Sequence, residues 1–475
     1  MNIHIVGICG KAIAYIATEC QRLGHTVTGS DNQCFPPVSH HLEKCGIPFQ
    51  VGYRAENVPA FAEVVILNTF VKRHNPELRE ALRRRLEIHS FPSFLEKYFL
   101  SGKQRLVIAG TKGKSTTTAM LAHILKHVGR PPACLVGGEF ISGEKCVHFA
   151  PEAETWVIEG DEYWTGCWDT GAKFSHYWPE AVCLTNLEDE HLDIYRGGFS
   201  DIRAEYLKLV EMIPANGWIV YWAGDERTAD LAVHCEGRHF SVGVTEGMGL
   251  RVMNVELQVE STTFLVNEQE FRLKIPGTHN AWNAALASGM ALPLGISLAE
   301  CAEALASFQG LRNRQELAFE IQGVRAYDEP AKNWLNVSNG QAAVRQMNPG
   351  REVVIVYRPN AAGLSHQTPQ LRLPAALATA DQVLLLKPTR QTVTVEDGGF
   401  DVERLGREIR ELGTPCAHID EYDFQAMLPE LARPGTVFVF YYAPYGNPLL
   451  DMLRTYLETP DLLAQFTFER PLTMT

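Results

Sequence analysis

The sequence has few features of a membrane-spanning, nucleic-acid-binding or metal-scaffold protein. It contains no uncharged apolar run of about 18 residues, the length that a membrane-spanning helix needs. Its net charge is -13, so it lacks the basic surface with which proteins attract nucleic-acid phosphates. Its 11 cysteines are an odd number and form no CxxC pair. We therefore expect reduced thiols, no zinc site or disulfide framework, no nucleic-acid partner and no membrane contact.

Repeats, low-complexity linkers and a secretion signal are also missing. The first residues, MNIHIVGICGKAIAY, have no basic segment before the apolar stretch and follow a pattern of strand, turn and helix. An apolar fraction of 45% and a charged fraction of 21% are typical of a globular protein. We expect a cytoplasmic protein that is a monomer or a weak dimer.

The length of 475 residues predicts two or three domains. Apolar strands alternate with helical stretches along the chain, as in NIHIVG followed by KAIAYIATECQRLG, which predicts an α/β fold with parallel sheets. We place an N-terminal Rossmann-like domain at residues 1–104, a central P-loop-type ATPase α/β domain at 105–316 and a C-terminal Rossmann-like domain at 317–475.

The most informative segment is RLVIAGTKGKSTTT at residues 105–118, an apolar strand that runs into a glycine-rich turn and a helix. Free N–H groups in such a turn, together with the helix dipole, favour a bound phosphate. Lys114 would neutralise the phosphates of ATP, and the Ser115 hydroxyl would bind Mg²⁺. Ile108 stands where the strict GxxxxGK[ST] pattern has a glycine, and an ordinary turn with a lysine cap is the alternative. The predicted phosphate-binding residues are Gly110, Thr111, Lys112, Gly113, Lys114, Ser115 and Thr116.

The first strand-to-helix turn contains Gly7 and Gly10, and Asp31 ends the second strand. An acidic side chain at that position can accept hydrogen bonds from a ribose. Cys9 and Ala12 replace two glycines of the GxGxxG pattern. The pattern therefore predicts a nucleotide-binding domain, with a purely structural domain as the alternative.

Carboxylates follow two further apolar strands. Glu159, Asp161 and Glu162 come after TWVI, and His191 lies in NLEDEHLD, after AVCLT. Open α/β sheets bind ligands at the carboxyl ends of their strands, and clustered carboxylates favour a cation there. Glu159 and His191 could ligate a second metal ion that bridges a phosphate and a substrate carboxylate. A solvated loop and a surface histidine are the alternatives.

Polar residues also occur at the start of a later helix and near the predicted third domain. Asn280 and Asn283 are either helix caps or contacts to an adenine edge. Arg312 and Arg314 are either solvated or able to reach a γ-phosphate when domains close. Three residues of YDEPAKNW could face the same cleft: Asp328, Lys332 and Asn333.

Taken in order, the motifs GTKGKSTTT, EGDE, TNLEDEHLDIY, GTHNAWNA, RNRQE and YDEPAKN resemble those of the Mur ligases, the ATP-dependent amide ligases of peptidoglycan assembly. The resemblance covers nearly the whole chain. It implies a domain for a UDP-sugar, an ATPase domain, and a third domain that closes over ATP and admits an amine. The implied reaction joins the carboxylate of UDP-N-acetylmuramate to a peptide amine through an acyl phosphate, with the murein tripeptide of peptidoglycan recycling as acceptor.

The resemblance also implies a role for each motif residue. The implied catalytic residues are Lys114, Glu159, His191 and Arg314, and the implied Mg²⁺ ligands are Ser115, Glu159 and His191. The implied ATP contacts beyond the phosphate loop are Asn280, Asn283, Arg314, Asp328, Lys332 and Asn333, and the implied uridine contacts are Gly7, Gly10 and Asp31.

The third domain departs from the family pattern where the incoming amine would bind. Glu329 replaces an aspartate, Lys332, Asn333 and Trp334 replace His-His-Pro, and Asn360 stands at the place of an arginine. A guanidinium lost there would leave a peptide carboxylate unpaired. An amide synthetase with a different acceptor amine or carboxylate donor is therefore the alternative function. A catalytically weak nucleotide-binding regulator is a third possibility, against which the intact ATP-site residues count.

Overall fold

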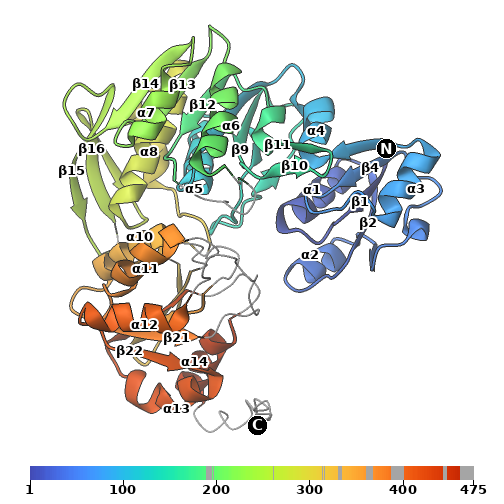
Figure 1. The fold of residues 1–475 in the computed structure, drawn as a ribbon. Helices are drawn as coiled ribbons and strands as arrows, with labels where there is room; N and C mark the ends of the chain where they lie inside the picture. The colour runs from blue at the N-terminus through green and yellow to red at the C-terminus, as the bar shows by residue number, and fades with distance from the viewer. Residues whose placement is uncertain are drawn as a thin grey trace. The chain divides into compact units, whose positions relative to one another are not determined.

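The structure is a computed structural model in which three α/β sheets follow one another along the chain (Figure 1). It describes residues 1–188, 195, 197–259, 261–312, 314, 316–329, 334–359, 367–386, 401–441 and 447–459, with the backbone alone for 367–370. Contacts divide the chain into two units. The first contains Met1–Glu256, Thr263–Lys274 and His279–Gly310, and the second contains Leu257–Thr262, Ile275–Thr278 and Leu311–Thr475.

The N-terminal sheet has five parallel strands in the order β3-β2-β1-β4-β5. Its chain order reverses between β1 and β4, and ligands of open α/β sheets bind at such a switch point. The buried residues of β1 and β4 are consistent with the apolar runs that predicted these strands. The elements are β1 (Asn2–Val6), α1 (Lys11–Arg22), β2 (Thr26–Asp31), α2 (Val38–Lys44), β3 (Phe49–Val51), β4 (Val64–Leu67), α3 (Pro76–Arg84) and β5 (Glu87–Ser90).

The central sheet has ten strands in the order β17-β16-β15-β14-β13-β12-β6-β9-β7-β8. Strand β6 lies between β9 and β12 and is parallel to both. Its last residues are fully buried, as expected of a strand covered on both faces. The strands are β6 (Gln104–Ala109), β7 (Ala133–Leu135), β8 (Val147–His148), β9 (Thr155–Glu159), β12 (Ala181–Leu184), β13 (Trp218–Trp222), β14 (Arg238–Gly243), β15 (Leu250–Leu257), β16 (Thr262–Val266) and β17 (Gln269–Leu273).

Helices and one small hairpin accompany the central sheet. The hairpin pairs β10 (Trp164–Gly166) with β11 (Asp169–Ala172) in antiparallel fashion. The segment that leads into β6 contains α4 (Phe91–Leu95). The other helices are α5 (Lys114–His127), α6 (Phe199–Glu211), α7 (Glu226–Ala232), α8 (Thr278–Ala291) and α9 (Leu298–Ala306).

The third sheet has six strands in the order β18-β19-β23-β20-β21-β22, parallel except for the first pair. Alternate residues of its strands enter two apolar clusters, so both faces are covered. Helices α10, α11 and α12 contribute to one cluster, and α13 and α14 contribute to the other (Figure 1). The elements are β18 (Leu317–Ile321), β19 (Val324–Glu329), α10 (Trp334–Met347), β20 (Glu352–Tyr357), α11 (Gln367–Leu377), β21 (Gln382–Leu386), α12 (Val402–Glu411), β22 (Cys416–Ile419), α13 (Glu421–Leu431), β23 (Thr436–Tyr441) and α14 (Pro448–Glu458).

These sheets confirm the predicted α/β fold class with mostly parallel strands. The boundaries at residues 104 and 316 stay predictions. Within the described residues, no helix is both long enough and apolar enough to cross a bilayer.

The expectation that every thiol is reduced is wrong. Cys9 and Cys34 form a disulfide with their Cα atoms 5.4 Å apart, while the other nine cysteines are free. No local pattern marks this pair, because 25 positions separate the two residues. Parallel pairing of β1 with β2 brings together the two segments that follow these strands.

Candidate functional site

The glycine-rich turn between β6 and α5 has a backbone that only glycine fits well. Gly110 and Gly113 have φ values of 131° and 83°, in the region that other residues avoid. A Cβ on Gly110 would lie 2.2 Å from Thr185 Oγ1, and a Cβ on Gly113 would lie 2.5 Å from Asn283 Oδ1. The turn therefore packs closely against β12 and α8 while α5 begins directly at Lys114. This is the strand, turn and helix that the sequence predicted for a phosphate.

Asn186, just after β12, fixes the conformation of this turn. Its Oδ1 accepts a hydrogen bond from Lys112 N at 2.9 Å, and its Nδ2 donates to Lys112 O at 2.9 Å. The backbone carbonyl of Asn186 accepts from Thr111 N at 2.8 Å, and the Thr111 hydroxyl accepts from Glu188 N at 2.8 Å. These hydrogen bonds tie the turn to the segment after β12. The first amides of a helix have no partner within the helix and favour an anion at its N-terminus.

Lys114 lies at the start of α5 and forms an ion pair with Glu162. The Nζ atom is 3.1 Å and 3.0 Å from the two carboxylate oxygens, and it also donates to Gly110 O at 2.5 Å. Only 13% of the lysine side chain and 6% of the glutamate side chain are exposed, so water screens this pair weakly. Tyr195 OH donates to the backbone carbonyl of Glu162 and fixes that segment.

Ser115 and Glu159 come together although 44 positions separate them. The Ser115 hydroxyl donates to Glu159 Oε1 at 2.9 Å, and Gly137 N donates to Glu159 Oε2 at 2.5 Å. Burial raises the pKa of the Glu159 carboxyl, although Lys114 and both hydrogen bonds favour its charged form. The nearby Asp161 behaves differently. Burial opposes its ionisation too, but the ion pair with Lys173 at 2.7 Å holds the pKa of Asp161 at about 2.

The donor set of Ser115 and Glu159 fits a magnesium ion. Mg²⁺ binds oxygen ligands and usually takes one or two protein oxygens, with phosphate and water completing its shell. A hydroxyl and a carboxylate beside a phosphate-type turn supply such oxygens. Within the described residues, no group of three or more His, Cys, Asp or Glu side chains is placed to hold a metal ion by protein ligands alone. His191, the other predicted metal ligand, lies outside the described residues.

Asn280 and Asn283 lie in the first half of α8 and are 3% and 6% exposed. Asn283 Nδ2 donates to Asn280 Oδ1 at 3.1 Å, and Asn283 Oδ1 is the atom nearest to where a Gly113 Cβ would lie. The structure therefore places this pair beside the phosphate-type turn. Thr116, the last predicted phosphate contact, is half-buried in the first turn of α5.

The predicted uridine contacts lie together at the switch point of the N-terminal sheet. Gly7 has a φ of 85°, and a Cβ on it would lie 2.6 Å from Asn68 Cβ. Asp31 ends β2, and its Oδ2 accepts from Cys9 N at 2.9 Å, in the turn that also contains Gly10. Its Oδ1 accepts from Tyr53 OH at 3.1 Å and from the following amide.

The remaining predicted residues belong to the second unit. Arg314 is exposed, and Arg312 Nη1 forms an ion pair with Glu316 Oε1 at 3.1 Å. Asp328 is in β19, where Asn447 Nδ2 donates to its Oδ1 at 3.0 Å and burial raises the pKa of its carboxyl. Lys332 and Asn333 lie outside the described residues.

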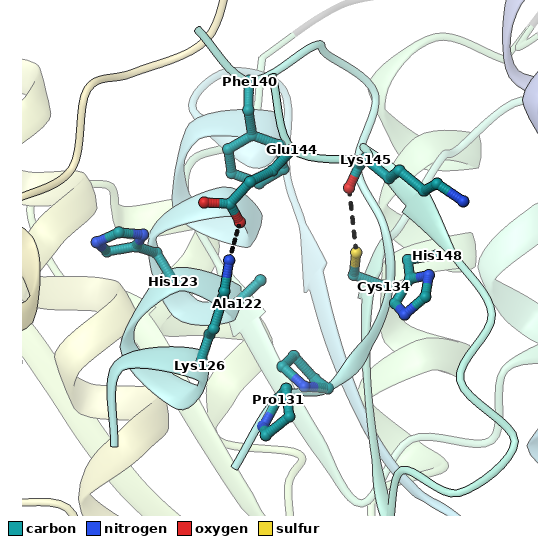
Figure 2. Close-up of a pocket in the computed structure, with 10 residues that line it drawn as sticks. Ala122, His123, Lys126, Pro131, Cys134, Phe140, Glu144, Lys145 and His148 are labelled. Atoms are coloured by element: carbon teal, nitrogen blue, oxygen red, sulfur yellow. Dashed lines mark hydrogen bonds and ion pairs between the residues drawn. The ribbon is translucent and has the colours of Figure 1, made fainter. Parts of the chain in front are cut away.

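A separate cavity of about 270 Å³ lies at the other end of α5. Figure 2 shows Ala122, His123 and Lys126 of that helix beside Phe140, with Lys126 Nζ paired to Glu144 at 3.0 Å. Ala122, His123 and Lys126 belong to the second half of α5, whereas the phosphate-type turn precedes the first residue of that helix. This cavity is therefore distinct from the predicted ATP site.

Three contributions to the site could not be read from the sequence. Glu162 and Asn186 stand out there as members of acidic motifs, but nothing marks the pairing of Glu162 with Lys114 or the hydrogen bonds of Asn186 to Lys112. Gly137, whose amide donates to Glu159, does not stand out in any motif. No local pattern signals these contacts, because their partners are 22 to 74 positions away.

Family comparisons match most of the chain. Residues 108–291 match the family described as Mur ligase middle domain, and residues 2–101 match the family described as Mur ligase family, catalytic domain. A relative from Escherichia coli (strain K12), UDP-N-acetylmuramate–L-alanyl-γ-D-glutamyl-meso-2,6-diaminoheptandioate ligase, is 33% identical over 395 residues, covering 82% of this chain and 85% of the relative. The enzyme of the same name from Haemophilus influenzae is 29% identical over 408 residues, covering 83% and 88%.

Solved structures share this fold over almost the full length. A murein peptide ligase from Psychrobacter arcticus aligns with a TM-score of 0.70 and 24% identity, covering 97% of this chain and 99% of that one. UDP-N-acetylmuramate-alanine ligase from Thermotoga maritima aligns with a TM-score of 0.75 and 24% identity, covering 96% and 98%. At these identities the two structures support the fold alone.

Proposed function

This chain is a member of the Mur ligase family, ATP-dependent ligases that form C–N bonds, and from that premise we propose its substrates. We propose that it joins the carboxylate of UDP-N-acetylmuramate to the amine of the murein tripeptide, L-alanyl-γ-D-glutamyl-meso-diaminopimelate, in peptidoglycan recycling. The observation that carries the proposal is the 33% identity to the E. coli ligase over 82% of this chain. Its substrates are small molecules, and we place the enzyme in the cytoplasm as a monomer or weak dimer.

In this proposal ATP binds the turn between β6 and α5. The phosphates bind at the turn and at the start of α5, while the Lys114 ammonium exchanges Glu162 for phosphate oxygens. The amides of Thr111 and Lys112 are not among the phosphate donors, because they donate to Asn186. The buried pair of Asn280 and Asn283 beside Gly113 supports a position close to the nucleotide. The proposed ATP contacts of the second unit are Arg314, Asp328, Lys332 and Asn333.

Ser115 and Glu159 would hold Mg²⁺, with His191 as a further ligand. The metal would neutralise charge on the phosphate oxygens during transfer. This role suits the half-buried Glu159, since a cation favours the charged carboxylate that desolvation disfavours.

The chemistry needs no protein nucleophile. The substrate carboxylate attacks the γ-phosphorus of ATP, which breaks the bond to the bridging oxygen, releases ADP and gives an acyl phosphate. The amine then attacks the acyl carbon, loses a proton and releases phosphate. The chain contributes alignment and charge neutralisation through Lys114 and, in this proposal, Arg314. The UDP part would bind at the switch point of the N-terminal sheet, with Gly7, Gly10 and Asp31 as its contacts.

A second candidate function has a different acceptor amine. It is favoured by the altered residues of the third domain, among which Glu329 is 5% exposed. A Cβ on Gly340 would lie 2.2 Å from Glu329 Oε2, so this carboxylate packs tightly against α10. Asn360, at the position where the family has an arginine, lies outside the described residues.

Phosphate release with a panel of amines would test both functions. The purified protein is incubated with ATP, Mg²⁺ and UDP-N-acetylmuramate, and each amine is added in turn. Turnover with the tripeptide alone supports the first function, and turnover with another amine supports the second. Binding of ATP without phosphate release for any combination of donor and amine would indicate a regulator instead. As control, Lys114→Ala should remove turnover while its circular dichroism spectrum stays unchanged.

A further inference from the structure

The loop from β7 to β8 holds the carboxylate of Glu159 in place. Because β7 and β9 are parallel neighbours, Gly137 just after β7 and Glu159 at the end of β9 lie at the same edge of the central sheet. Gly137 N donates to Glu159 Oε2 at 2.5 Å, and a Cβ on Gly137 would lie 2.7 Å from that oxygen. The carboxylate therefore lies directly against the loop backbone, and its position depends on the position of the loop.

Helix α1 binds the same loop two residues further along. Tyr15 OH donates to Glu139 Oε1 at 2.8 Å, and Lys11 Nζ is 3.4 Å from the same oxygen. The Lys11 side chain is 54% exposed, so water weakens its ion pair, and the Tyr15 hydrogen bond is the stronger contact. Burial and the Glu139 carboxylate raise the pKa of the Tyr15 hydroxyl above its usual range. The hydroxyl therefore stays protonated and remains a donor.

Neighbouring contacts fix the direction of the Tyr15 side chain. Its ring lies against that of His41 in α2, with the ring centroids 4.6 Å apart. One turn further along α1, the buried Glu19 accepts from Lys145 Nζ at 2.8 Å and from Phe149 N at 3.0 Å, on the two sides of β8. Tyr15 and Glu19 are four positions apart and therefore share one face of the helix. This face of α1 thus contacts both the loop and β8.

We propose that Tyr15 is a positioning residue for Glu159. Its hydrogen bond to Glu139 fixes the loop that holds this carboxylate beside Ser115, where Mg²⁺ would bind. The proposal rests on the proposed function, in which Glu159 is a ligand of that ion. Helix α1 begins directly after the turn that contains Gly7 and Gly10, and both sheets belong to the first unit. A side chain beside the proposed uridine site would thus support the metal site of the central sheet.

The geometry that Mg²⁺ requires explains why such support matters. The ion needs near-ideal octahedral coordination with ligand distances of about 2.0–2.1 Å, so a small displacement of one carboxylate lowers the affinity. Groups that hold a ligand without touching the metal contribute to affinity for this reason. Without the Tyr15 hydroxyl, the loop loses its strongest contact to α1 at Glu139. The carboxylate that depends on the loop is then less well fixed.

The experiment measures how much Mg²⁺ improves the affinity of the full-length protein for a non-hydrolysable ATP analogue. Calorimetry gives the affinity once with Mg²⁺ and once with EDTA, and the ratio of the two is the metal-dependent gain. Tyr15→Phe removes the hydroxyl alone, and Glu139→Ala removes the same contact from the other side. Tyr98→Phe is the matched control, because Tyr98 is also half-buried and its hydroxyl donates to a glutamate, Glu87 Oε1, at 2.7 Å.

We expect Tyr15→Phe and Glu139→Ala each to reduce the gain by about fivefold, because each removes the same hydrogen bond. The double variant should lose no more than either single variant, since the two residues act as one unit. The affinity measured in EDTA should stay unchanged, because the phosphate-type turn is not altered. Tyr98→Phe should keep the full gain although it loses an equivalent hydrogen bond.

A full gain in Tyr15→Phe would overturn the positioning role. A loss of affinity that is equal with Mg²⁺ and with EDTA would overturn it too, because it would reflect a general disturbance. Glu159→Gln separates this failure from that of the proposed function. If Glu159→Gln loses the gain while Tyr15→Phe keeps it, the proposed metal ligand stands and the positioning role alone fails. If Glu159→Gln also keeps the full gain, Glu159 is not a metal ligand and both proposals fail.

Discussion

At single positions, the chemistry of this site depends on partners that are distant in the sequence. Lys114 belongs to a local motif, but its ammonium is neutralised by Glu162, 48 positions later. Both side chains are largely buried, so removal of either one takes away the nearest opposite charge of the other. In the proposed function, the ion pair keeps the lysine at the turn until phosphate replaces the carboxylate.

Glu162→Gln is expected to lower the stability of the ATP-free protein and to increase the stabilisation that ATP produces. Loss of the charged partner should lower the stability of the free protein by about 3 kcal/mol, because the buried Lys114 ammonium loses its nearest carboxylate. ATP should then raise the melting temperature more than it does in the unsubstituted protein. Differential scanning fluorimetry with and without ATP measures both effects.

Glu180→Gln is the matched control for that substitution. Glu180 pairs with Arg105 at the opposite end of β6 from the turn. Its loss should reduce stability without changing the shift that ATP produces. An unchanged ATP shift in Glu162→Gln would show that this carboxylate does not compete with phosphate for Lys114.

At the level of elements, hydrogen bonds between neighbouring segments set the shape of each proposed pocket. Asn186 joins the end of β12 to the phosphate-type turn. In the N-terminal sheet, the fully buried Glu77 of α3 plays a similar part. Its carboxylate accepts from His4 Nε2 at 3.2 Å and Asn57 Nδ2 at 2.7 Å, and also from the Ser30 hydroxyl.

Asn186→Ala should raise the KM for ATP by roughly tenfold, because two hydrogen bonds of about 1 kcal/mol each no longer hold the turn. Phosphate release as a function of ATP concentration measures this. Asn267→Ala is a fair comparison, since Asn267 also bonds to backbone atoms of the central sheet, at Arg251 N and Gly249 O. It should lower stability but leave the KM for ATP unchanged. Equal KM values for the two variants would contradict the proposal that the Asn186 hydrogen bonds hold the ATP-binding turn.

Glu77→Gln should destabilise the N-terminal sheet by about 3 kcal/mol at pH 7, because the amide presents a donor to groups that are themselves donors. Burial raises the pKa of Glu77, but hydrogen bonds from His4, Ser30 and Asn57 outweigh it and lower the pKa. A lowered pKa stabilises the fold above the unfolded value of about 4.3 and ceases to do so as pH falls through the folded value. The difference between the two proteins should therefore shrink below about pH 4.

Hydrogen exchange of peptides from β1, β2 and α3 in urea would measure that difference at each pH. Glu43→Gln provides the comparison, since Glu43 is an exposed carboxylate on α2. It should change neither stability nor its pH dependence. A gap between Glu77→Gln and the unsubstituted protein that stays constant down to pH 3 would contradict the lowered pKa.

For the whole molecule, the proposed ATP contacts are divided between the two units. Lys114 and Ser115 are in the first unit, whereas Arg314 and Asp328 are in the second. A nucleotide that touches all four must fix the second unit against the first. In the proposed function, substrate binding would therefore be coupled to domain closure.

The radius of gyration from small-angle X-ray scattering should fall when a non-hydrolysable ATP analogue, Mg²⁺ and UDP-N-acetylmuramate are all present. Contacts from both units to one nucleotide favour the closed form. Lys114→Ala should show no such decrease, because it lacks the main charge that binds phosphate. A radius that is identical with and without ligands in the unsubstituted protein would show that closure does not accompany binding.

Local sequence determined a large part of this protein. The turn at residues 110–113 and the helix that follows it depend on neighbouring residues, so the motif predicted them. The left-handed conformations of Gly110 and Gly113 and the exact start of the helix at Lys114 came from the structure. Strands β1, β6 and β23 could be predicted for the same reason, because a short run of apolar residues identifies a buried parallel strand.

Tertiary structure alone decided which groups meet. Glu162 reaches Lys114, Asn186 reaches Lys112 and Cys34 reaches Cys9 only because the order of strands in each sheet brings distant loops to one edge. Sequence patterns report interactions over a few residues, whereas these contacts follow from strand pairing across 25 to 74 positions. The sequence therefore determined the phosphate-type turn and the fold class. The fold determined which distant residues set the charge and the shape of that turn, and which cysteine bonds to Cys9.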